Sequence, residues 1–270
     1  MTKITRITTQ KKNKNRYNIF LNDGQGEKYG FSVDEAILVE YRLHKDQELS
    51  EQMIATLIQK DTLHKSYTQV INYLSYRMRT KQEVYNYLIK KEVDEEHITK
   101  IIDKLIKEKL IDDEQFAESF VRTRIQTSDK GPMLVKRELI EKGVSAAIAS
   151  QAVEVYTYEI QYEKAFKWAE KRLNRTSKHS FRKQAQQIQA TLMQKGFTQE
   201  VTKDIGKAIQ EEKDGGAEWE ALVHHGEKLL RKHQKKLSGY ELRNKLTEGL
   251  FRNGFSFELI NQYVDDVMES

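Results

Sequence analysis

Cysteine is absent from this 270-residue sequence, and proline occurs only once, at position 132. Without cysteine the chain can form neither disulfides nor thiolate metal sites. With a single proline, long stretches of the chain are free to form helices. The sequence has no run of about 18 apolar residues, and its N-terminus lacks the apolar core of a signal peptide. We therefore expect a largely helical, soluble and cytoplasmic protein with no membrane association.

Patterns that identify enzymes are missing as well. There is no glycine-rich phosphate loop and no Gly-x-Ser-x-Gly nucleophile elbow. His224 and His225 are adjacent, so on a helix they point about 100° apart and cannot form the paired ligands of a zinc-protease helix. Asp112 and Asp113 suit a helix cap and a first-turn acid better than a two-metal site. We expect no enzymatic activity, no metal and no cofactor.

The charge and apolar content bound the type of molecule. Apolar residues make up 38% of the chain and charged residues 32%, which favours an elongated, surface-rich protein over one with a single large core. The net charge of +5 gives a mild bias toward polyanions. Such a bias does not by itself establish nucleic-acid binding.

A helix stop followed at once by a helix start occurs four times. Each copy has a leucine, an apolar residue five places later and Asp, Ser or Thr six places later. The leucines are Leu88, Leu139, Leu192 and Leu250, and the residues four places after them are Glu92, Gly143, Gly196 and Gly254. Glycine after a helix end adopts a left-handed conformation, and the next apolar residue folds back on the leucine. The pattern predicts tandem three-helix repeats.

Glu92 is the one departure from this pattern. A glutamate in a left-handed conformation costs about 1–2 kcal/mol relative to glycine. We therefore expect the first helix stop to have a different geometry from the other three.

The N-terminal region is the only β-like part of the sequence. Residues 17–21 and 29–33 alternate apolar and polar side chains around a turn at 22–26, and a third strand is expected near Ile4–Thr9. Ser32 and Glu35 have the spacing of a capping box that starts a helix, and Ser50 starts another. These two helices would join the hairpin to the repeats.

The predicted fold is mostly α, with about four tandem three-helix repeats in an elongated curved array after a small N-terminal β-hairpin or meander. The predicted domain boundaries are 1–66 for the N-terminal region and 67–110, 111–158, 159–211 and 212–270 for the repeats.

Three stretches resemble the RecX family of regulators of the RecA recombinase. They are YLSYRMRTKQEVYNYLIKK at 73–91, LIDDEQFAESFVRTR at 110–124 and GPMLVKRELIEKGV at 131–144. The resemblance is close from Tyr73 to Val144 and looser through the later repeats to Met268. Ser128, Asp129 and Lys130 depart from it, because the family often has a more glycine-rich turn at this place.

The resemblance implies a partner and a mode of action. The partner would be the nucleoprotein filament that RecA forms on single-stranded DNA, with the protein lying in its groove as a monomer and bridging neighbouring subunits. ATP hydrolysis, strand exchange and repressor cleavage by RecA would fall. Direct contact with single- or double-stranded DNA is a further expectation.

Basic side chains are the candidates for contact with the partner or DNA. They are Arg77, Arg79, Lys81, Arg122, Lys130, Lys136 and Arg137, a third-repeat stripe of Lys164, Lys167, Lys171 and Arg175, and a fourth-repeat stripe of Lys228, Arg231, Lys232 and Lys235. Each stripe is also explained by the solvated outer face of an amphipathic helix. The first sixteen residues carry six basic side chains and no acid, which suits either a protected sheet edge or a phosphate-contacting arm.

Arg122 and Arg124 are expected to differ in role. On a helical wheel Arg124 lies inside the apolar arc that contains Phe116, whereas Arg122 lies outside it. Arg124 should therefore be structural and paired with a carboxylate, for which Asp112, Asp113 and Glu138 are candidates. Arg122 is left as a contact residue.

A DNA-binding helical repeat protein with little sequence specificity is the alternative function. The helix–turn–helix pairs resemble DNA-reading modules, whose second helix presents its N-terminus to the bases. Here those N-termini carry Glu95–Glu96, Gln199–Glu200 and Phe257–Glu258, which would face phosphates with carboxylates. Sequence-specific recognition is therefore disfavoured.

Overall fold

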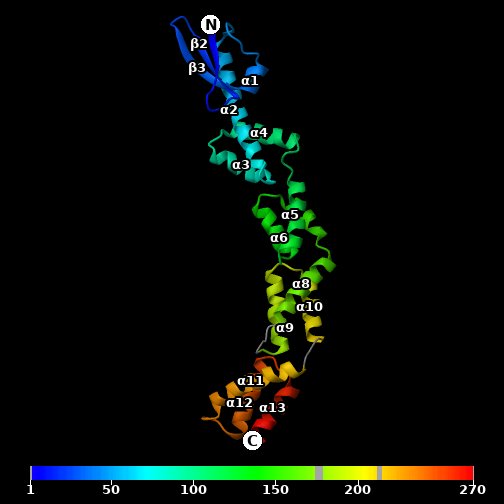
Figure 1. Cartoon of the computed structure of the whole chain (residues 1–270). Coiled ribbons are helices and arrows are strands. Elements are labelled where there is room, and N and C mark those ends of the chain that lie inside the picture. Colours follow the sequence, from blue (N-terminus) through cyan, green and yellow to red (C-terminus); the bar gives the residue numbers. More distant parts are fainter. Residues whose placement is uncertain (1, 174–178, 212–214, 270) are drawn as a thin grey trace. The chain divides into compact units, whose positions relative to one another are not determined.

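The computed structural model describes residues 2–173, 179–211 and 215–269 (Figure 1). The chain divides into two units, of which the first comprises Met1–Phe116 with Lys142–Val144 and the second Ala117–Glu141 with Ser145–Ser270. None of the helices described combines the length and apolar character needed to cross a membrane.

The first unit begins with a small antiparallel sheet. Its strands are β1 (Thr2–Thr9), β2 (Arg16–Asn22), β3 (Glu27–Asp34) and β4 (Glu48–Leu49), in the order β3-β2-β1-β4. The hairpin and the third strand near the N-terminus are confirmed. Strand β4 was not predicted, because two residues are too few to show an alternating pattern.

The helix after the sheet starts at a different residue from the one predicted. Strand β3 continues through Ser32, and the side chain of Asp34 caps α1 (Glu35–Glu40) by accepting a hydrogen bond from the Ala36 N–H. The Ser32 capping box is therefore wrong. Ser50 caps α2 (Glu51–Leu74) as predicted, since its hydroxyl accepts from the Met53 N–H.

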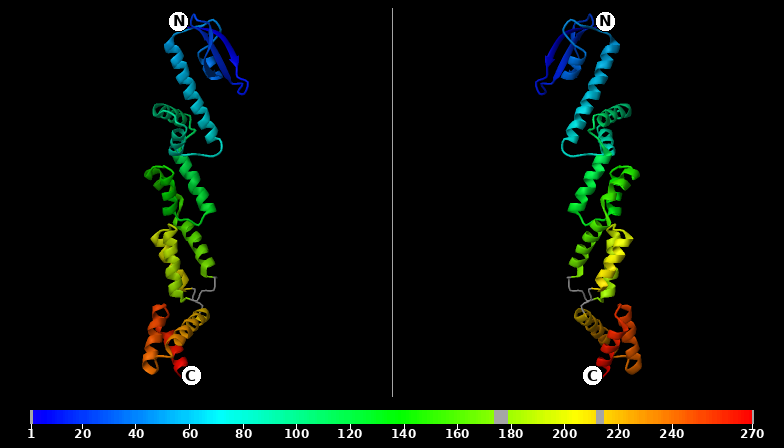
Figure 2. Two further views of the ribbon diagram at one scale, coloured as in Figure 1. Left: turned by 90° about the vertical axis from the view of Figure 1, so that its left-hand side faces the viewer. Right: turned by 90° about the vertical axis from the view of Figure 1, so that its right-hand side faces the viewer.

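Helix α2 belongs to two cores at once (Figure 2). Leu57 is fully buried with the sheet residues, among them Ile4 and Ile19. Val70, further along the same helix, is fully buried with Leu88 in the core of the first repeat. The boundary predicted between residues 66 and 67 thus falls inside a continuous helix.

The remaining helices complete the four repeats. The first repeat continues from α2 with α3 (Lys81–Lys90) and α4 (Glu95–Lys107), and the second has α5 (Asp113–Thr127), α6 (Pro132–Glu141) and α7 (Ala146–Ala152), with a 3₁₀ turn at Val153–Val155. The third has α8 (Tyr158–Leu173), α9 (Phe181–Gln194) and α10 (Gln199–Glu211), and the fourth has α11 (Gly215–His233), α12 (Gly239–Arg252) and α13 (Phe257–Glu269). Pro132 is the first residue of α6, where a helix needs no N–H donor.

The four helix stops lie where the leucines predicted them, and all four leucines are 0% exposed. The Val93 N–H donates to the Leu88 carbonyl at 3.2 Å, and Phe197 and Phe255 donate in the same way to Leu192 and Leu250. The residues at the left-handed position have φ of 86° at Gly143, 86° at Gly196, 89° at Gly254 and 56° at Glu92. The expectation that Glu92 changes the geometry is therefore wrong.

The glycines are required by their neighbours as well as by φ. A Cβ atom on Gly143 would lie 2.2 Å from the Gln82 Cβ, and one on Gly196 would lie 2.5 Å from the Leu134 backbone nitrogen. A Cβ on Gly254 would lie 2.7 Å from the Ser180 hydroxyl. In each case the neighbour belongs to the middle helix of the preceding repeat or to its cap. Glu92 is in the first repeat and is exposed, so its side chain meets no such helix.

The carbonyl just before each of these glycines accepts a hydrogen bond from the same preceding helix. The Thr80 hydroxyl donates to Lys142 at 2.6 Å, the Gly131 N–H to Lys195 at 2.7 Å and the Ser180 hydroxyl to Asn253 at 2.6 Å. We call this recurring contact the repeat joint. It ties each of the last three helix stops to the start of the middle helix one repeat earlier.

Candidate interaction surfaces

Arg124 has the structural role that its position in the helix predicted. Its Nε atom donates to a Glu138 carboxylate oxygen at 2.8 Å, and Lys130 binds the other oxygen. Burial opposes ionisation of Glu138, but the hydrogen bonds from Lys130 and Arg124 outweigh it and hold the pKa of this carboxyl below its usual value. Of the three candidate partners, Glu138 is the one used. The charge of Lys130 is shared with this pair, and its role as a contact residue stays a prediction.

Replacing Glu138 by glutamine should make the free energy of unfolding less dependent on pH in the acidic range. The lowered pKa means that the native carboxylate stabilises the fold above the ordinary glutamate pKa of about 4.3, and that this contribution is lost as pH falls through the folded-state value. We expect Glu138→Gln to cost about 1–2 kcal/mol at pH 7 and much less near pH 3. Urea denaturation of both chains at the two pH values measures the difference. A difference that stays constant between them would contradict the assignment.

The first-repeat arginines are held by local contacts. Arg77 pairs with Glu83 at 2.9 Å, and the Arg79 guanidinium lies 4.1 Å from the centre of the Tyr73 ring. Both arginines therefore fix the loop between α2 and α3, while the Lys81 side chain is exposed. Whether any of the three contacts a partner stays a prediction.

Adjacent aspartates cap two different helices. The Asp112 carboxylate accepts from the Gln115 N–H and caps α5 as predicted. The Asp113 carboxylate accepts from the Lys81 N–H at 2.9 Å, at the start of α3. Within the described ranges 2–173, 179–211 and 215–269, no group of three or more His, Cys, Asp or Glu side chains is arranged to hold a metal ion.

The second-repeat candidates lie on exposed helix faces. Arg122 is exposed, with Glu118 3.8 Å away one turn earlier. On α6, Arg137 is exposed and Lys136 is half-buried, and both lie between the exposed apolar side chains of Met133 and Ile140. This face therefore combines positive charge with apolar surface.

Each repeat exposes one large apolar side chain at the same place, directly after the joint leucine. These residues are Ile89, Ile140, Met193 and Phe251, which are 47%, 44%, 56% and 46% exposed. We call them the apolar row. Sequence reasoning missed them, although aligning the four leucines and comparing the next position would have found them. The recurrence of a large exposed apolar residue at the same position in four of four repeats makes these residues candidates for an interaction surface.

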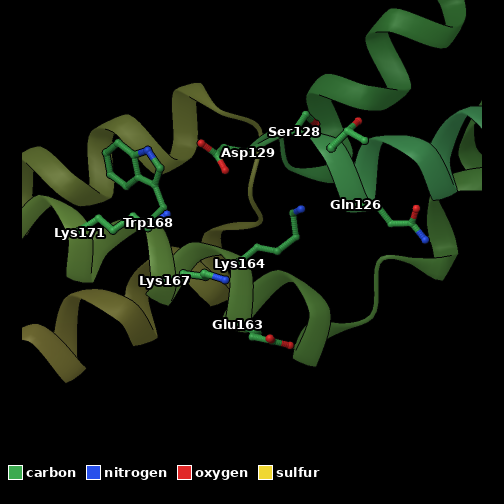
Figure 3. Close-up of a pocket in the computed structure, with 9 residues that line it drawn as sticks. Gln126, Ser128, Asp129, Glu163, Lys164, Lys167, Trp168 and Lys171 are labelled. Atoms are coloured by element: carbon green, nitrogen blue, oxygen red, sulfur yellow. The ribbon is translucent and has the colours of Figure 1, made fainter.

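The third-repeat stripe borders a pocket of about 310 Å³ between α8 and the end of α5 (Figure 3). Lys164 is half-buried, and its ammonium group donates to the Ile125 carbonyl at the C-terminal end of α5. Burial lowers the pKa of Lys164. Lys167 and Lys171 are exposed beside the Trp168 ring. Lys164 therefore acts as a helix cap, and two lysines of the stripe are left at the surface; Arg175 lies outside the described residues.

Three members of the fourth-repeat stripe lie on α11, and Lys235 lies in the turn after the helix ends at His233. Lys228, Lys232 and Lys235 are exposed, and Arg231 pairs with Glu227 at 3.1 Å one turn earlier. The amphipathic arrangement is as predicted, with Leu222 fully buried in the core of the same repeat. Contact with a partner stays a prediction for this stripe as well.

Comparison with protein-family models gives matches along most of the chain. Residues 2–50 match the regulatory protein RecX N-terminal domain, residues 67–105 the first RecX three-helix domain and residues 112–153 the second. The model of the third three-helix domain matches twice, at 159–205 and at 217–264. The third and fourth repeats are therefore both similar to one family domain.

Curated relatives match over nearly their whole length. The regulatory protein RecX of Oceanobacillus iheyensis is 55% identical over 271 residues, which cover 100% of this chain and 99% of that protein. The regulatory protein RecX of Bacillus cytotoxicus is 40% identical over 264 residues, which cover 98% of this chain and 97% of that protein.

Solved structures show a similar fold. A crystal structure of regulatory protein RecX covers 77% of this chain and 100% of its own, with 38% identity and a TM-score of 0.67. The crystal structure of RecX from Lactobacillus salivarius covers 56% of this chain and 98% of its own, with 40% identity and a TM-score of 0.54.

Proposed function

Because this chain belongs to the RecX family of regulatory proteins, we propose that it binds the nucleoprotein filament of the RecA recombinase and lowers the activities of that filament. The family establishes a regulatory role. The identity of the partner is the step that we add, and it follows the resemblance of residues 73–144 described above.

The apolar row is the observation that best supports this proposal. A filament is a polymer of one subunit, so it presents the same site many times. A chain of similar repeats that each expose one apolar side chain at the same position is suited to occupying several such sites together. Each exposed side chain can then bury its area against an equivalent place on a subunit.

The mechanism is inhibition by binding. The array of repeats would lie in the filament groove, bridge neighbouring subunits and oppose both filament growth and the conformational changes that accompany ATP hydrolysis. Strand exchange and repressor cleavage would fall with ATP hydrolysis. This chain would perform no chemistry itself and would act as a monomer without a cofactor.

A titration tests the proposal directly. Purified chain is added to RecA filaments preformed on single-stranded DNA, and ATP hydrolysis is followed together with electron microscopy of the filaments. We expect the hydrolysis rate to fall as the chain decorates the filaments. Unchanged hydrolysis and strand exchange at micromolar excess would refute the proposal.

The apolar row should carry a large part of the affinity. Changing Ile89, Ile140, Met193 and Phe251 together to asparagine removes exposed apolar area without changing charge, so the core leucines and the net charge stay the same. We expect the concentration needed for half-inhibition to rise at least about tenfold, because one or two buried apolar anchors are enough for that loss.

A matched control uses exposed residues outside the row. Val39, Met53, Ile58 and Tyr240 are also exposed apolar residues, and their change to asparagine should leave inhibition within about twofold of the native chain. Equal loss in the two variants would mean that the row has no special part in binding.

Direct binding to DNA with little sequence specificity is a second candidate function. The exposed Lys167 and Lys171 beside Trp168, and the exposed Arg137 and Arg122, favour it, because phosphate contacts dominate such binding. It predicts retention of naked DNA that weakens steeply with salt and does not depend on sequence. Binding to naked DNA with no effect on RecA filaments would favour this candidate over the first.

A further inference from the structure

Helix α8 presents a ladder of aromatic rings beside its buried alanines, at the edge of the third-repeat core. Tyr158, Tyr162 and Phe166 are spaced four residues apart, so they follow one another along the same side of the helix. Their rings stack in sequence, with centres 5.9 Å apart for the first pair and 6.0 Å for the second. Tyr158 is 38% exposed, and the other two rings are half-buried. The ladder is therefore an accessible apolar surface on a well-packed helix.

Acidic side chains border this ladder. Glu159, Glu163 and Glu170 are exposed and line the same shallow groove of about 640 Å³ as the three rings. Among the described residues of this lining, Lys167 is the single cation. Across the helix pair, the Tyr158 hydroxyl donates to the Asp204 carboxylate of α10 at 2.9 Å, which fixes the first ring. Lys207 pairs with the same carboxylate at 3.3 Å, so Asp204 adds no net charge to the rim. The groove thus combines apolar rings with a net negative rim.

We propose that this acidic aromatic groove on α8 docks a segment of a protein partner that carries arginine or lysine next to apolar side chains. The ring faces attract cations and bury apolar groups, and the carboxylates at the rim can accept hydrogen bonds from a guanidinium. The same carboxylates repel phosphate, so a nucleic acid is a poor occupant. The occupant is therefore protein.

This inference rests on the proposed function and makes it more specific. It assigns the groove to the protein subunits of the filament, whereas the exposed Lys171 lines the neighbouring pocket beside Trp168 and is free to face DNA. One helix would then contact both components of the filament.

Charge reversal tests the inference with a result of opposite sign for the two kinds of ligand. In the variant Glu159→Lys, Glu163→Lys, Glu170→Lys, we expect binding to preformed RecA filaments to weaken about tenfold, because attraction at three rim positions becomes repulsion. Binding to naked single-stranded DNA should become equal or tighter in the same variant, because three positive charges are added.

A control variant separates the position of the charges from their number. Glu220, Glu241 and Glu258 are exposed acids of the fourth repeat, and their change to lysine alters the net charge by the same amount. We expect this control to bind filaments no more weakly than the native chain. Equal or tighter filament binding by the α8 variant than by the control would overturn the inference.

A photo-crosslinking residue at Tyr162 gives a measurement that does not depend on added charge. We expect it to link the chain to RecA within the filament, while the same residue at the exposed Arg172 gives little or none of that product. A main product linked to DNA, or to a second copy of this chain, would overturn the inference. If the native chain neither binds nor inhibits the filament, the proposed function fails and the inference fails with it; if the native chain inhibits and both α8 tests are negative, only the inference fails.

Discussion

The Gly196→Ala variant should lose about 3 kcal/mol of unfolding free energy or more. Alanine in the left-handed conformation that Gly196 adopts costs about 1–2 kcal/mol. The added Cβ would also lie 2.5 Å from the Leu134 backbone nitrogen, and a backbone atom cannot move aside as the end of a side chain can. Relieving that overlap costs about 1–3 kcal/mol more. It also weakens the Gly131 hydrogen bond of the repeat joint and the adjacent hydrogen bond from the Met133 N–H to the Gly196 carbonyl.

Urea denaturation followed by tryptophan fluorescence measures this effect, because Trp168 packs against the core of the third repeat. Glu92→Gly is the matched control. It changes the same position of the helix stop, where φ is also positive but the side chain is exposed. We expect that variant to gain about 1 kcal/mol. A native-like midpoint for Gly196→Ala would show that the joint is not tightly packed.

The Asp61→Ala variant should destabilise the first unit by about 3–5 kcal/mol. Asp61 is 7% exposed, and its carboxylate accepts from the Arg16 guanidinium at 2.6 Å and from the Asp34 N–H at 2.7 Å. Removing it leaves a half-buried guanidinium without its carboxylate and a backbone N–H without its acceptor. Loss of one partner of a buried ion pair is among the most costly single changes in a protein.

A double variant distinguishes the ion pair from simple loss of packing. Arg16→Met with Asp61→Leu replaces both charges by apolar groups of similar size, and we expect it to recover most of the stability lost by Asp61→Ala. Hydrogen exchange at the amides of β1–β3 reports on the sheet directly. If both variants lose the same amount, the contribution comes from the hydrogen bond that Asp61 accepts from the Asp34 N–H and not from its ion pair with Arg16.

Features encoded over a few residues could be predicted from the sequence. The joint leucines are predictable because a helix stop and the next helix start occupy only six consecutive positions after each leucine. The structural role of Arg124 is predictable because its side of the helix depends only on local spacing. The contact between Thr80 and Lys142 joins residues 62 positions apart, so no local pattern could show it. The geometry of the first helix stop is predicted wrongly because the sequence shows the conformational cost of a left-handed glutamate but not that the Glu92 side chain is exposed.

The candidate contact residues were less predictable for the same reason. Sequence patterns identified basic side chains, but whether a lysine is available depends on distant groups. Lys164 is engaged by the carbonyl of Ile125, which is 39 positions away, whereas Lys167 on the same helix is exposed. The aromatic ladder of α8 went unnoticed because its four-residue spacing is also that of an ordinary buried face, and only the packing shows which side is covered.

The continuous helix α2 fixes a rotational phase between the sheet and the first repeat. Leu57 faces one core and Val70 the other, on a rod that turns about 100° and rises about 1.5 Å with each residue. One residue inserted between them would rotate the sheet about the helix axis by about 100°, whereas seven inserted residues would return it to within about 20° of its original orientation. Insertions and deletions in this segment should therefore be tolerated in heptads and selected against in single steps.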